Sequence, residues 1–417
     1  MPSSAGQTAP EAGTAGTLAL AGRRVLELAD GKGAYCGKLL ADMGADVIKI
    51  EPPGGDPMRA IPPFLHDTPD PDHSLSFLYM NTSKRGLTLD ITRPDGQALF
   101  AKLAQTADIV IETFAPGYLD SLAIGYRSLK ETNPRLVFTS ITGFGQRGPS
   151  AGFKSADLVA SALGGAMYVT GDGDDPPVTL AGTQSHVMAA TCAAVSSMIA
   201  LYRSTICGEG QHVDISVEEV MVSVTHICGV GKWLDDHMIP RRMGTRLFAS
   251  VPSGTYRCKD GLVYLMINRP AHWKVLAHWV AEVTGNSAVL DPLFEGPSSN
   301  RQPHRELLDA YISDLTSRFT VDAMYHEGQR RHLAFTPVNT AAAVATDPHL
   351  AARHYFVEVE HPVAGRLRYP GAPYRHADTP WRIRPAPRIG EHNRQVYCGE
   401  LRLAEAAFHD LEERGIV

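Results

Sequence analysis

The segment RVLELADGKGAYCGKLLADMGADVIKI, residues 24–50, decides the fold. Arg23–Ala29 is a short apolar run that predicts a β-strand. Tyr35–Met43 places its apolar residues on one face, which predicts a helix, and Gly44 follows where a C-terminal glycine is expected. Val47–Ile50 predicts a second strand. A strand, a helix and a second strand in this order favour a parallel sheet.

The same alternation recurs further along the chain. The pattern predicts strands at Gly86–Ile91, Asp108–Glu112 and Leu136–Ile141. It predicts a helix at Asp95–Thr106 and another within Leu119–Thr132. Strands that alternate with helices are typical of an α/β protein with a Rossmann-like layered sheet. We therefore predict a large Rossmann-like lobe.

After Pro252 the pattern changes. Thr255–Ile267 predicts a hairpin around Asp260–Gly261, and helical patterns follow to about His332. Before it, apolar stretches predict long helices at Val187–Tyr202 and Val217–Trp233, and Tyr355–Arg366 and Pro370–Tyr374 look β-rich. The expected domains are a flexible tail (1–18), the large lobe (19–244), a small central α+β lobe (245–335) and a return to the large lobe (336–417).

The composition excludes several classes of protein. A net charge of −6 and 20% charged residues, without a run of Lys or Arg, argue against nucleic-acid binding. The six cysteines form no CxxC pair, so neither disulfides nor a metal site is expected. The N-terminal tail lacks the features of a signal peptide, and Val187–Tyr202 is too short and interrupted for a membrane span. We expect a cytoplasmic protein that does not bind membranes.

One glycine motif invites a dinucleotide interpretation. Gly143–Gly148 reads GFGQRG, a GxGxxG after a strand, but Pro149 and Gly152 follow where a helix should begin. We interpret it as a loop at a strand end. The sequence contains no GxxxxGK[ST] and no GxSxG, so a P-loop is excluded and a hydrolase nucleophile elbow is unsupported.

Five blocks taken in order carry a more specific signal. They are VLELADGKGAYCGKLLADMGADVIKIEPPGGDPMR (25–59), NTSKRGLTLD (81–90), ADIVIETFAPGYLD (107–120), NPRLVFTSITGFGQRGP (133–149) and GEGQHVDIS (208–216). Together they resemble the family III CoA-transferases, the superfamily of formyl-CoA and carnitine CoA-transferases and α-methylacyl-CoA racemases. Phe335–Val338 and Gly390–His392 resemble the same family more weakly. The resemblance implies a large lobe from both chain ends, a small central lobe and two interlocked chains.

The resemblance also implies a ligand and its contacts. Coenzyme A, as free CoA or acyl-CoA, would be a substrate and not a tightly bound cofactor. Its phosphates need a few cationic groups and free backbone N–H groups. By matching motifs, the contact residues would be Lys32, Asn81, Thr82, Ser83, Lys84, Thr113, Phe114, Lys154 and Asp157. Pro52 and Ser121 stand where formyl-CoA transferase has CoA-contacting arginines, so the phosphate contacts must differ in detail.

Each of these assignments has a plainer alternative. Lys84–Arg85 could be a solvated pair before a strand, and Phe114 could be part of the core. Lys154 and Asp157 could form a local surface ion pair. Met238–Met243 could face the acyl chain or be an ordinary connector.

The nucleophile that the family uses is missing. Family III transfer employs an aspartate just before a small-residue helix, whose carboxylate forms a mixed anhydride and then an aspartyl-CoA thioester. That position falls at Ser185 or His186 here, next to Gln184, and no acidic residue lies between Pro176 and Asp214. The loop Asp172–Asp175 would replace it only through a gap and is interpreted as a solvated turn. Asp157 remains a candidate acid.

Three functions stay open at this stage. The chain could be a CoA-transferase subunit whose homologous partner supplies the aspartate, since it resembles the nucleophile-poor subunit of two-subunit benzylsuccinate-type CoA-transferases. It could act alone with altered chemistry at Gln184, Ser185 or His186, as an isomerase or a hydrolase. A racemase is disfavoured, because the family's histidine position is Ala156 here. It could also be a CoA-binding subunit without catalysis.

Overall fold

The computed structural model describes residues 18–226 and 229–417, which form two compact units. Unit 1 contains residues 18–164, 181–225 and 351–417. Unit 2 contains residues 165–180 together with the described part of 226–350. The predicted flexible tail lies outside the described residues, except for Leu18.

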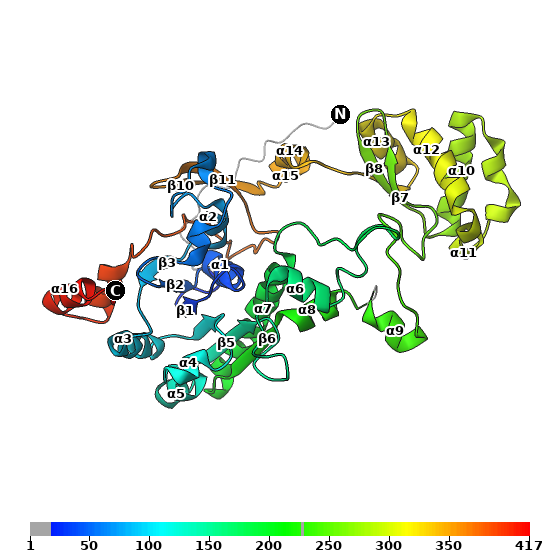
Figure 1. The fold of residues 1–417 in the computed structure, drawn as a ribbon. Helices are drawn as coiled ribbons and strands as arrows, with labels where there is room; N and C mark the ends of the chain where they lie inside the picture. The colour runs from blue at the N-terminus through cyan, green and yellow to red at the C-terminus, as the bar shows by residue number, and fades with distance from the viewer. Residues whose placement is uncertain (1–17, 227–228) are drawn as a thin grey trace. The chain divides into compact units, whose positions relative to one another are not determined.

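Unit 1 is built on a six-stranded sheet with the order β3-β2-β1-β4-β5-β6, in which every neighbouring pair is parallel (Figure 1). This is the strand order of a doubly wound Rossmann-like sheet. The predicted α/β class with a parallel sheet is confirmed. The strands are β1 (Arg24–Leu28), β2 (Asp46–Glu51), β3 (Arg85–Thr88), β4 (Ile109–Glu112), β5 (Val137–Thr142) and β6 (His212–Ser216).

Helices cover both faces of this sheet, because successive strand residues point to opposite sides. Val25 and Val47 pack under α1 (Ala34–Asp42) and α7 (Gln184–Cys207), and Leu26 and Ile48 pack on the opposite face. The remaining helices of unit 1 are α2 (Leu75–Met80), α3 (Pro94–Ala104), α4 (Tyr118–Ser121), α5 (Tyr126–Thr132), α6 (Asp157–Leu163), α8 (Val217–Val224) and α16 (Glu405–Glu413).

The C-terminal part of the chain completes unit 1. Tyr397, Phe408 and Leu411 are buried in the same core as α3 and β1, and the backbone N–H of Asp90 donates to Ile416 O over 2.7 Å. A π-helix spans Gln395–Glu400, and β10 (Phe356–His361) pairs with β11 (Gly365–Pro370) as an antiparallel hairpin. Residues from both halves of the sequence therefore share one core.

Unit 2 has a small antiparallel sheet in the order β7-β8-β9, packed with helices. The hairpin predicted around Asp260–Gly261 is present, and the predicted small lobe, 245–335, falls entirely within this unit. The elements are α9 (Val230–Asp236), β7 (Ser253–Arg257), β8 (Leu262–Met266), α10 (Pro270–Thr284), α11 (Ser298–Arg301), α12 (Arg305–Ser317), α13 (Val321–Arg330), β9 (Ala334–Pro337) and α14 (Ala341–Ala345), with α15 (Pro348–Ala352) at its end.

Two predicted elements are wrong in extent. The single helix expected at Val217–Trp233 is two helices, because α8 ends at Val224 and α9 begins only at Val230. Val222, Val224 and Thr225 are β-branched and Gly229 stands directly before α9, so the helix propensity between the two helices is low. Strand β11 ends at Pro370, so the expected strand at Pro370–Tyr374 does not extend beyond its first residue.

The loop predicted at Gly143–Gly148 is confirmed, whereas the helix expected at Val187–Tyr202 spans Gln184–Cys207, so the prediction that it is too short to cross a membrane is wrong. No helix starts at Gly143–Gly148, since α6 begins only at Asp157, so this glycine motif is a loop. Among the described helices, α7 alone is long and apolar enough by composition to cross a membrane. Its alanine-rich face is buried on the sheet, and Ser197 Oγ lies 2.7 Å from Thr139 Oγ1 of β5. Helix α7 is thus a core helix of unit 1.

Candidate functional site

The sheet has a topological switch point between β1 and β4. In doubly wound sheets, ligands bind beyond the carboxyl ends of the strands at this point. The segments that emerge here are Asp30–Lys32 after β1 and Thr113–Phe114 after β4. They are tied together, because Asp30 N donates to Thr113 Oγ1 over 2.9 Å. Three predicted contact residues therefore meet where the topology places a ligand.

Lys32 supplies the positive charge at the switch point. Its ammonium donates to Asp30 Oδ2, and its backbone N–H donates to Asp30 Oδ1 over 2.9 Å. Burial alone would raise the pKa of Asp30, but Lys32 and Thr113 hold that pKa below its ordinary value. The pair places a cation with a fixed counter-ion beside the ends of β1 and β4.

Glu112, the last residue of β4, is a buried carboxyl next to this pair. It is 5% exposed, and burial raises its pKa to about 7. Ser140, the N–H of Phe114 and the charge of Lys32 oppose this rise. The N–H of Phe114 donates to Glu112 Oε2 over 2.7 Å. Glu112 is therefore an acid that titrates near neutrality directly behind the predicted contact residues.

The first turn of α7 holds the position of the missing nucleophile. Asp157, at the start of α6, accepts three hydrogen bonds on Oδ1: from Ser185 N at 2.8 Å, Ser185 Oγ at 2.6 Å and His186 N at 3.3 Å. The Asp157 carboxylate thus caps the N-terminus of α7, where backbone N–H groups lack helical partners. Gln184 donates to Ala181 O over 3.0 Å.

His186 lies in the same electrostatic environment as the switch point. Burial lowers its pKa, Lys32 lowers it further, and Asp157 and Asp30 partly oppose the shift. A lowered pKa favours the neutral imidazole at physiological pH. The charge of Lys32 acts on the pKa of both His186 and Glu112, and we refer to these three groups as the electrostatic cluster.

The predicted phosphate-contact stretch Asn81–Lys84 occupies a buried polar network. Lys84 Nζ donates to Glu27, to the carbonyl of Ala34 and to Asn81, each over 2.8 Å. The Lys84 side chain is 0% exposed, so the interpretation of Lys84–Arg85 as a solvated pair is wrong. Burial lowers the pKa of Lys84 to about 8, although Glu27 raises it.

Thr82 and Ser83 belong to the same network. Both hydroxyls donate to Asp42 Oδ1, from 3.0 Å and 2.7 Å, and Lys38 Nζ lies 2.7 Å from Thr82 Oγ1. Within unit 1 these side chains are therefore engaged with neighbouring groups. Their contact with CoA remains a prediction.

The other predicted residues are placed as follows. Phe114 is half-buried and lies 4.9 Å, centroid to centroid, from the ring of Tyr118 at the edge of a core cluster. Lys154 is exposed, and in the described part of the chain it forms no ion pair with Asp157. The Asp172–Asp175 loop belongs to unit 2, where its carbonyls accept hydrogen bonds from Arg242.

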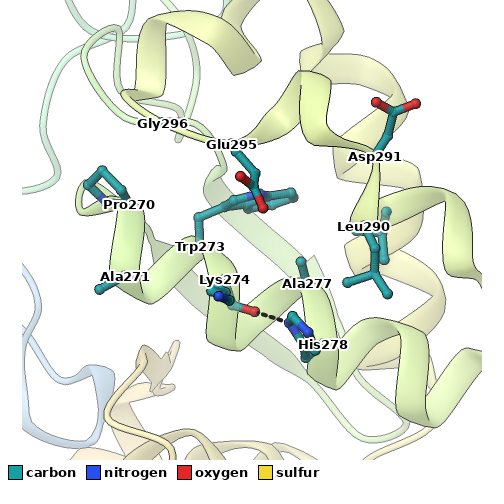
Figure 2. A pocket seen from close by; sticks show the side chains of 11 residues that line it. Pro270, Ala271, Trp273, Lys274, Ala277, His278, Leu290, Asp291, Glu295 and Gly296 are labelled. Atoms are coloured by element: carbon teal, nitrogen blue, oxygen red, sulfur yellow. Dashed lines mark hydrogen bonds between the residues drawn. The ribbon is translucent and has the colours of Figure 1, made fainter.

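A separate cleft of about 520 Å³ lies in unit 2, along α10. Figure 2 shows Lys274 and His278 on α10, with Asp291 and Glu295 coming from the segment that follows it. This cleft along α10 is lined by none of the predicted site residues. Across residues 18–226 and 229–417, no group of three or more His, Cys, Asp or Glu side chains could hold a metal ion.

Sequence reasoning missed Asp30 and Glu112 as site residues. Both lie inside the quoted blocks, and each stands at or just beyond the carboxyl end of a buried strand. That position was the available signal, because the carboxyl ends of parallel strands form the ligand edge of such sheets.

Comparison with known proteins identifies the family. The family model described as CoA-transferase family III matches residues 20–393. The chain is 34% identical, over 90% of its length and 93% of the relative, to succinyl-CoA:(R)-benzylsuccinate CoA-transferase subunit BbsE of Thauera aromatica. It is 30% identical to the formyl-CoA:oxalate CoA-transferase of Streptomyces coelicolor, over 96% of this chain and 99% of the relative.

A solved structure shows the same fold. A CAIB/BAIF family protein from Brucella suis superposes with a TM-score of 0.81 at 28% identity, covering 92% of this chain and 99% of that one. The match extends over both units. The chain belongs to CoA-transferase family III and is an enzyme of the CoA-transferase class.

Proposed function

We propose that this chain transfers CoA between an acyl-CoA thioester and a carboxylic acid as one subunit of an oligomer, and that a homologous partner supplies the catalytic aspartate. The observation that carries the proposal is the first turn of α7. It presents Gln184, Ser185 and His186 where the family's nucleophile is expected, and none of them is a carboxylate.

The chemistry explains why a carboxylate is needed. The aspartate attacks the thioester carbonyl, expels the CoA thiolate and becomes a mixed anhydride; the thiolate then attacks the aspartyl carbonyl and releases the first acid. The acceptor carboxylate attacks the aspartyl thioester, expels the CoA thiolate and forms a second mixed anhydride. The thiolate then attacks the acceptor's carbonyl and releases the aspartate carboxylate, which restores the enzyme. Every covalent intermediate stays activated, which a serine ester would not achieve.

Asp157 is a poor replacement for this nucleophile. Three donors converge on its Oδ1 at the N-terminus of α7. Such donors and the helix dipole stabilise negative charge in the ground state, which lowers the reactivity of the carboxylate. Asp157 therefore holds the helix start in place and does not attack the thioester.

The ligand would lie over the switch point. We assign Lys32 to the acyl end, and Thr113 and Phe114 to the adenine and pantetheine portion. Lys154 is an exposed candidate for the thioester end. The stretch Asn81–Lys84 is a secondary candidate, because the side chains of Asn81, Thr82 and Lys84 are buried. CoA enters and leaves as a substrate, so no tightly bound cofactor is required.

An exposed apolar stripe on α7 supports a partner chain. Val195, Ile199, Tyr202 and Ile206 recur on one helix face and are 56–70% exposed. An apolar face of this kind marks a protein interface. Together with the word subunit in the name of the Thauera relative, it favours a homologous partner, with the two chains interlocked. We also propose a cytoplasmic location, without contact to membranes or nucleic acids.

Isotope exchange tests this proposal. The purified chain is incubated with succinyl-CoA and labelled succinate, alone and after co-expression with a homologue that carries the aspartate. Exchange only with the partner supports the proposal, and exchange by the chain alone overturns it. Substitution of the partner's aspartate by asparagine should abolish the exchange.

His186 supports a second candidate function. Its lowered pKa keeps the imidazole neutral, as a general base requires. The chain alone would then hydrolyse or isomerise a CoA thioester. Release of free thiol or a change in the acyl group by the chain alone, lost in His186→Ala, would establish this alternative. Thermal stabilisation by free CoA tests binding under both proposals, and its absence would leave only a structural subunit.

A further inference from the structure

A line of polar side chains crosses three neighbouring strands behind the switch point. Glu112 of β4 pairs in register with Ser140 of β5, so both side chains lie on the same face. Ser140 Oγ lies 2.9 Å from Nε2 of His212 on β6. Glu112 and Ser140 are buried, and His212 lies near the exposed edge of the sheet.

The inner end of this line holds the backbone of Phe114, a predicted contact residue, and lies next to Thr113, which holds the backbone of Asp30. Glu112 Oε2 accepts the N–H of Phe114 over 2.7 Å, and Thr113 Oγ1 accepts the N–H of Asp30 over 2.9 Å. These two bonds fix the turn that leaves β4 and connect it to the turn that leaves β1. A shift of the Glu112 carboxyl would therefore move Phe114 directly and Asp30 through Thr113.

The line can exist in two protonation states because a serine hydroxyl both donates and accepts. Ser140 stands beside Glu112 in register and lowers its pKa, so with Glu112 ionised the Ser140 hydroxyl can turn its proton toward the carboxylate and accept from His212 Nε2–H. With Glu112 protonated, its O–H donates to Ser140 Oγ, and Ser140 donates to an unprotonated His212 Nε2. Only the first state leaves Glu112 as a charged acceptor for Phe114, and charged acceptors form the stronger hydrogen bonds.

Several charged groups bias this equilibrium. Lys32, after β1, stabilises the Glu112 carboxylate, whereas Asp120 on α4 opposes it. At the outer end, Asp214 on β6 and Asp120 favour a protonated His212, and Arg147 opposes it. Burial raises the pKa of Glu112 to about 7 and lowers that of His212. The change of state falls within the physiological range.

We propose that Glu112 is a positioning residue for the CoA site: its carboxylate sets the Thr113–Phe114 turn, and Ser140 and His212 couple that turn to a proton. This inference rests on the proposed function. It assigns no contact between Glu112 and the substrate. CoA binds more tightly when Glu112 is ionised.

The experiment measures the dissociation constant of free CoA by calorimetry at pH 6 and pH 8. Wild type should bind several-fold more weakly at pH 6, on the order of five-fold, from the weakened Phe114 bond. Glu112→Gln retains an amide oxygen for Phe114 at every pH and should lose this difference. Glu112→Leu should bind weakly at both pH values. The exposed Glu131→Gln serves as a control, and titration of the CoA phosphates affects all variants equally.

Amide hydrogen exchange at Phe114 provides a readout without ligand. Protection should fall in Glu112→Leu and persist in Glu112→Gln, after correction for intrinsic rates. An unchanged pH profile in Glu112→Gln, or unchanged Phe114 protection in Glu112→Leu, would overturn the inference. Failure of wild type to bind CoA at either pH would instead overturn the proposed function, while the exchange measurement still decides the role of Glu112.

Discussion

The carboxylate of Asp157 accepts hydrogen bonds from both the backbone N–H and the hydroxyl of Ser185, at 2.8 and 2.6 Å. The two residues are 28 positions apart, and their contact joins the start of α6 to the start of α7. Asp157, which the family resemblance makes a candidate acid, therefore caps the N-terminus of α7, where the family's nucleophile would lie.

Asp157→Ala should destabilise the protein by about 1–2 kcal/mol, because the first turn of α7 loses its cap. Asp157→Asn should recover most of this loss, since an amide oxygen still accepts from Ser185. Denaturant unfolding at pH 7 measures both variants. Equal stability of Asp157→Ala and wild type would show that the cap contributes nothing.

Asp157→Asn should also lower the pKa of His186. Asp157 raises the pKa of His186 against the larger effect of burial. Asp157→Asn removes this charge, so the pKa of His186 should fall further below its ordinary value. The imidazole C–H resonance, assigned with His186→Gln, reports the titration in NMR spectra. A rise of the pKa would contradict the electrostatic cluster described above.

Periodicity made the sheet predictable, because the buried strands are apolar runs and α1 carries a one-sided apolar face that ends at a glycine. The gap between α8 and α9 was harder to foresee, because the apolar residues on both sides of it fit one continuous helical pattern. The switch point itself was invisible, because strand order depends on which strands pair. The sequence places Asp30 and Glu112 at the ends of strands, but only the pairing of β1 with β4 brings both to the switch point.

The buried stretch near Lys84 illustrates a different limit. Lys and Asn before a strand are typical of an exposed anion-binding loop, and the motif match strengthened that interpretation. Glu27, which neutralises Lys84, lies 57 positions earlier, within β1. Pairing across that distance is a tertiary property that local sequence does not encode.

Lys84→Met should destabilise the protein by about 3–5 kcal/mol, because it leaves the fully buried Glu27 without its nearer cation. Lys49 lies 3.5 Å from Glu27 and is shared with Asp56. Lys102→Met, on the exposed face of α3, should cost less than about 0.5 kcal/mol. Normal stability with a large loss of CoA affinity in Lys84→Met would instead identify Lys84 as a ligand contact.

Gly37 should tolerate no side chain. A Cβ at this position of α1 would lie 1.6 Å from Glu27 Oε2, in a space closed by Lys84. Gly37→Ala should therefore cost about 3 kcal/mol, through overpacking beside a buried ion pair. Gly399→Ala is the matched control, because a Cβ added there would meet nothing within 4 Å. Similar melting temperatures for the two variants would contradict the close approach.

Glu112→Gln should become more stable relative to wild type as the pH rises. The pKa of Glu112 is raised from 4.5 to about 7 in the folded protein. Below pH 4.5 the carboxyl is neutral in both states and costs nothing. Between pH 4.5 and pH 7 the unfolded chain releases this proton while the folded chain retains it. The free energy of unfolding of wild type therefore falls by up to about 3 kcal/mol by pH 8.

Glutamine has no such proton, so the stability difference between Glu112→Gln and wild type should grow by that amount between pH 4.5 and pH 8. Denaturant unfolding across this range measures it. Ser140→Ala should steepen the pH dependence, because Ser140 stabilises the charged carboxyl. Parallel stability curves for wild type and Glu112→Gln would mean that Glu112 is ionised throughout this range, and the proton-coupled turn would lose its physical basis.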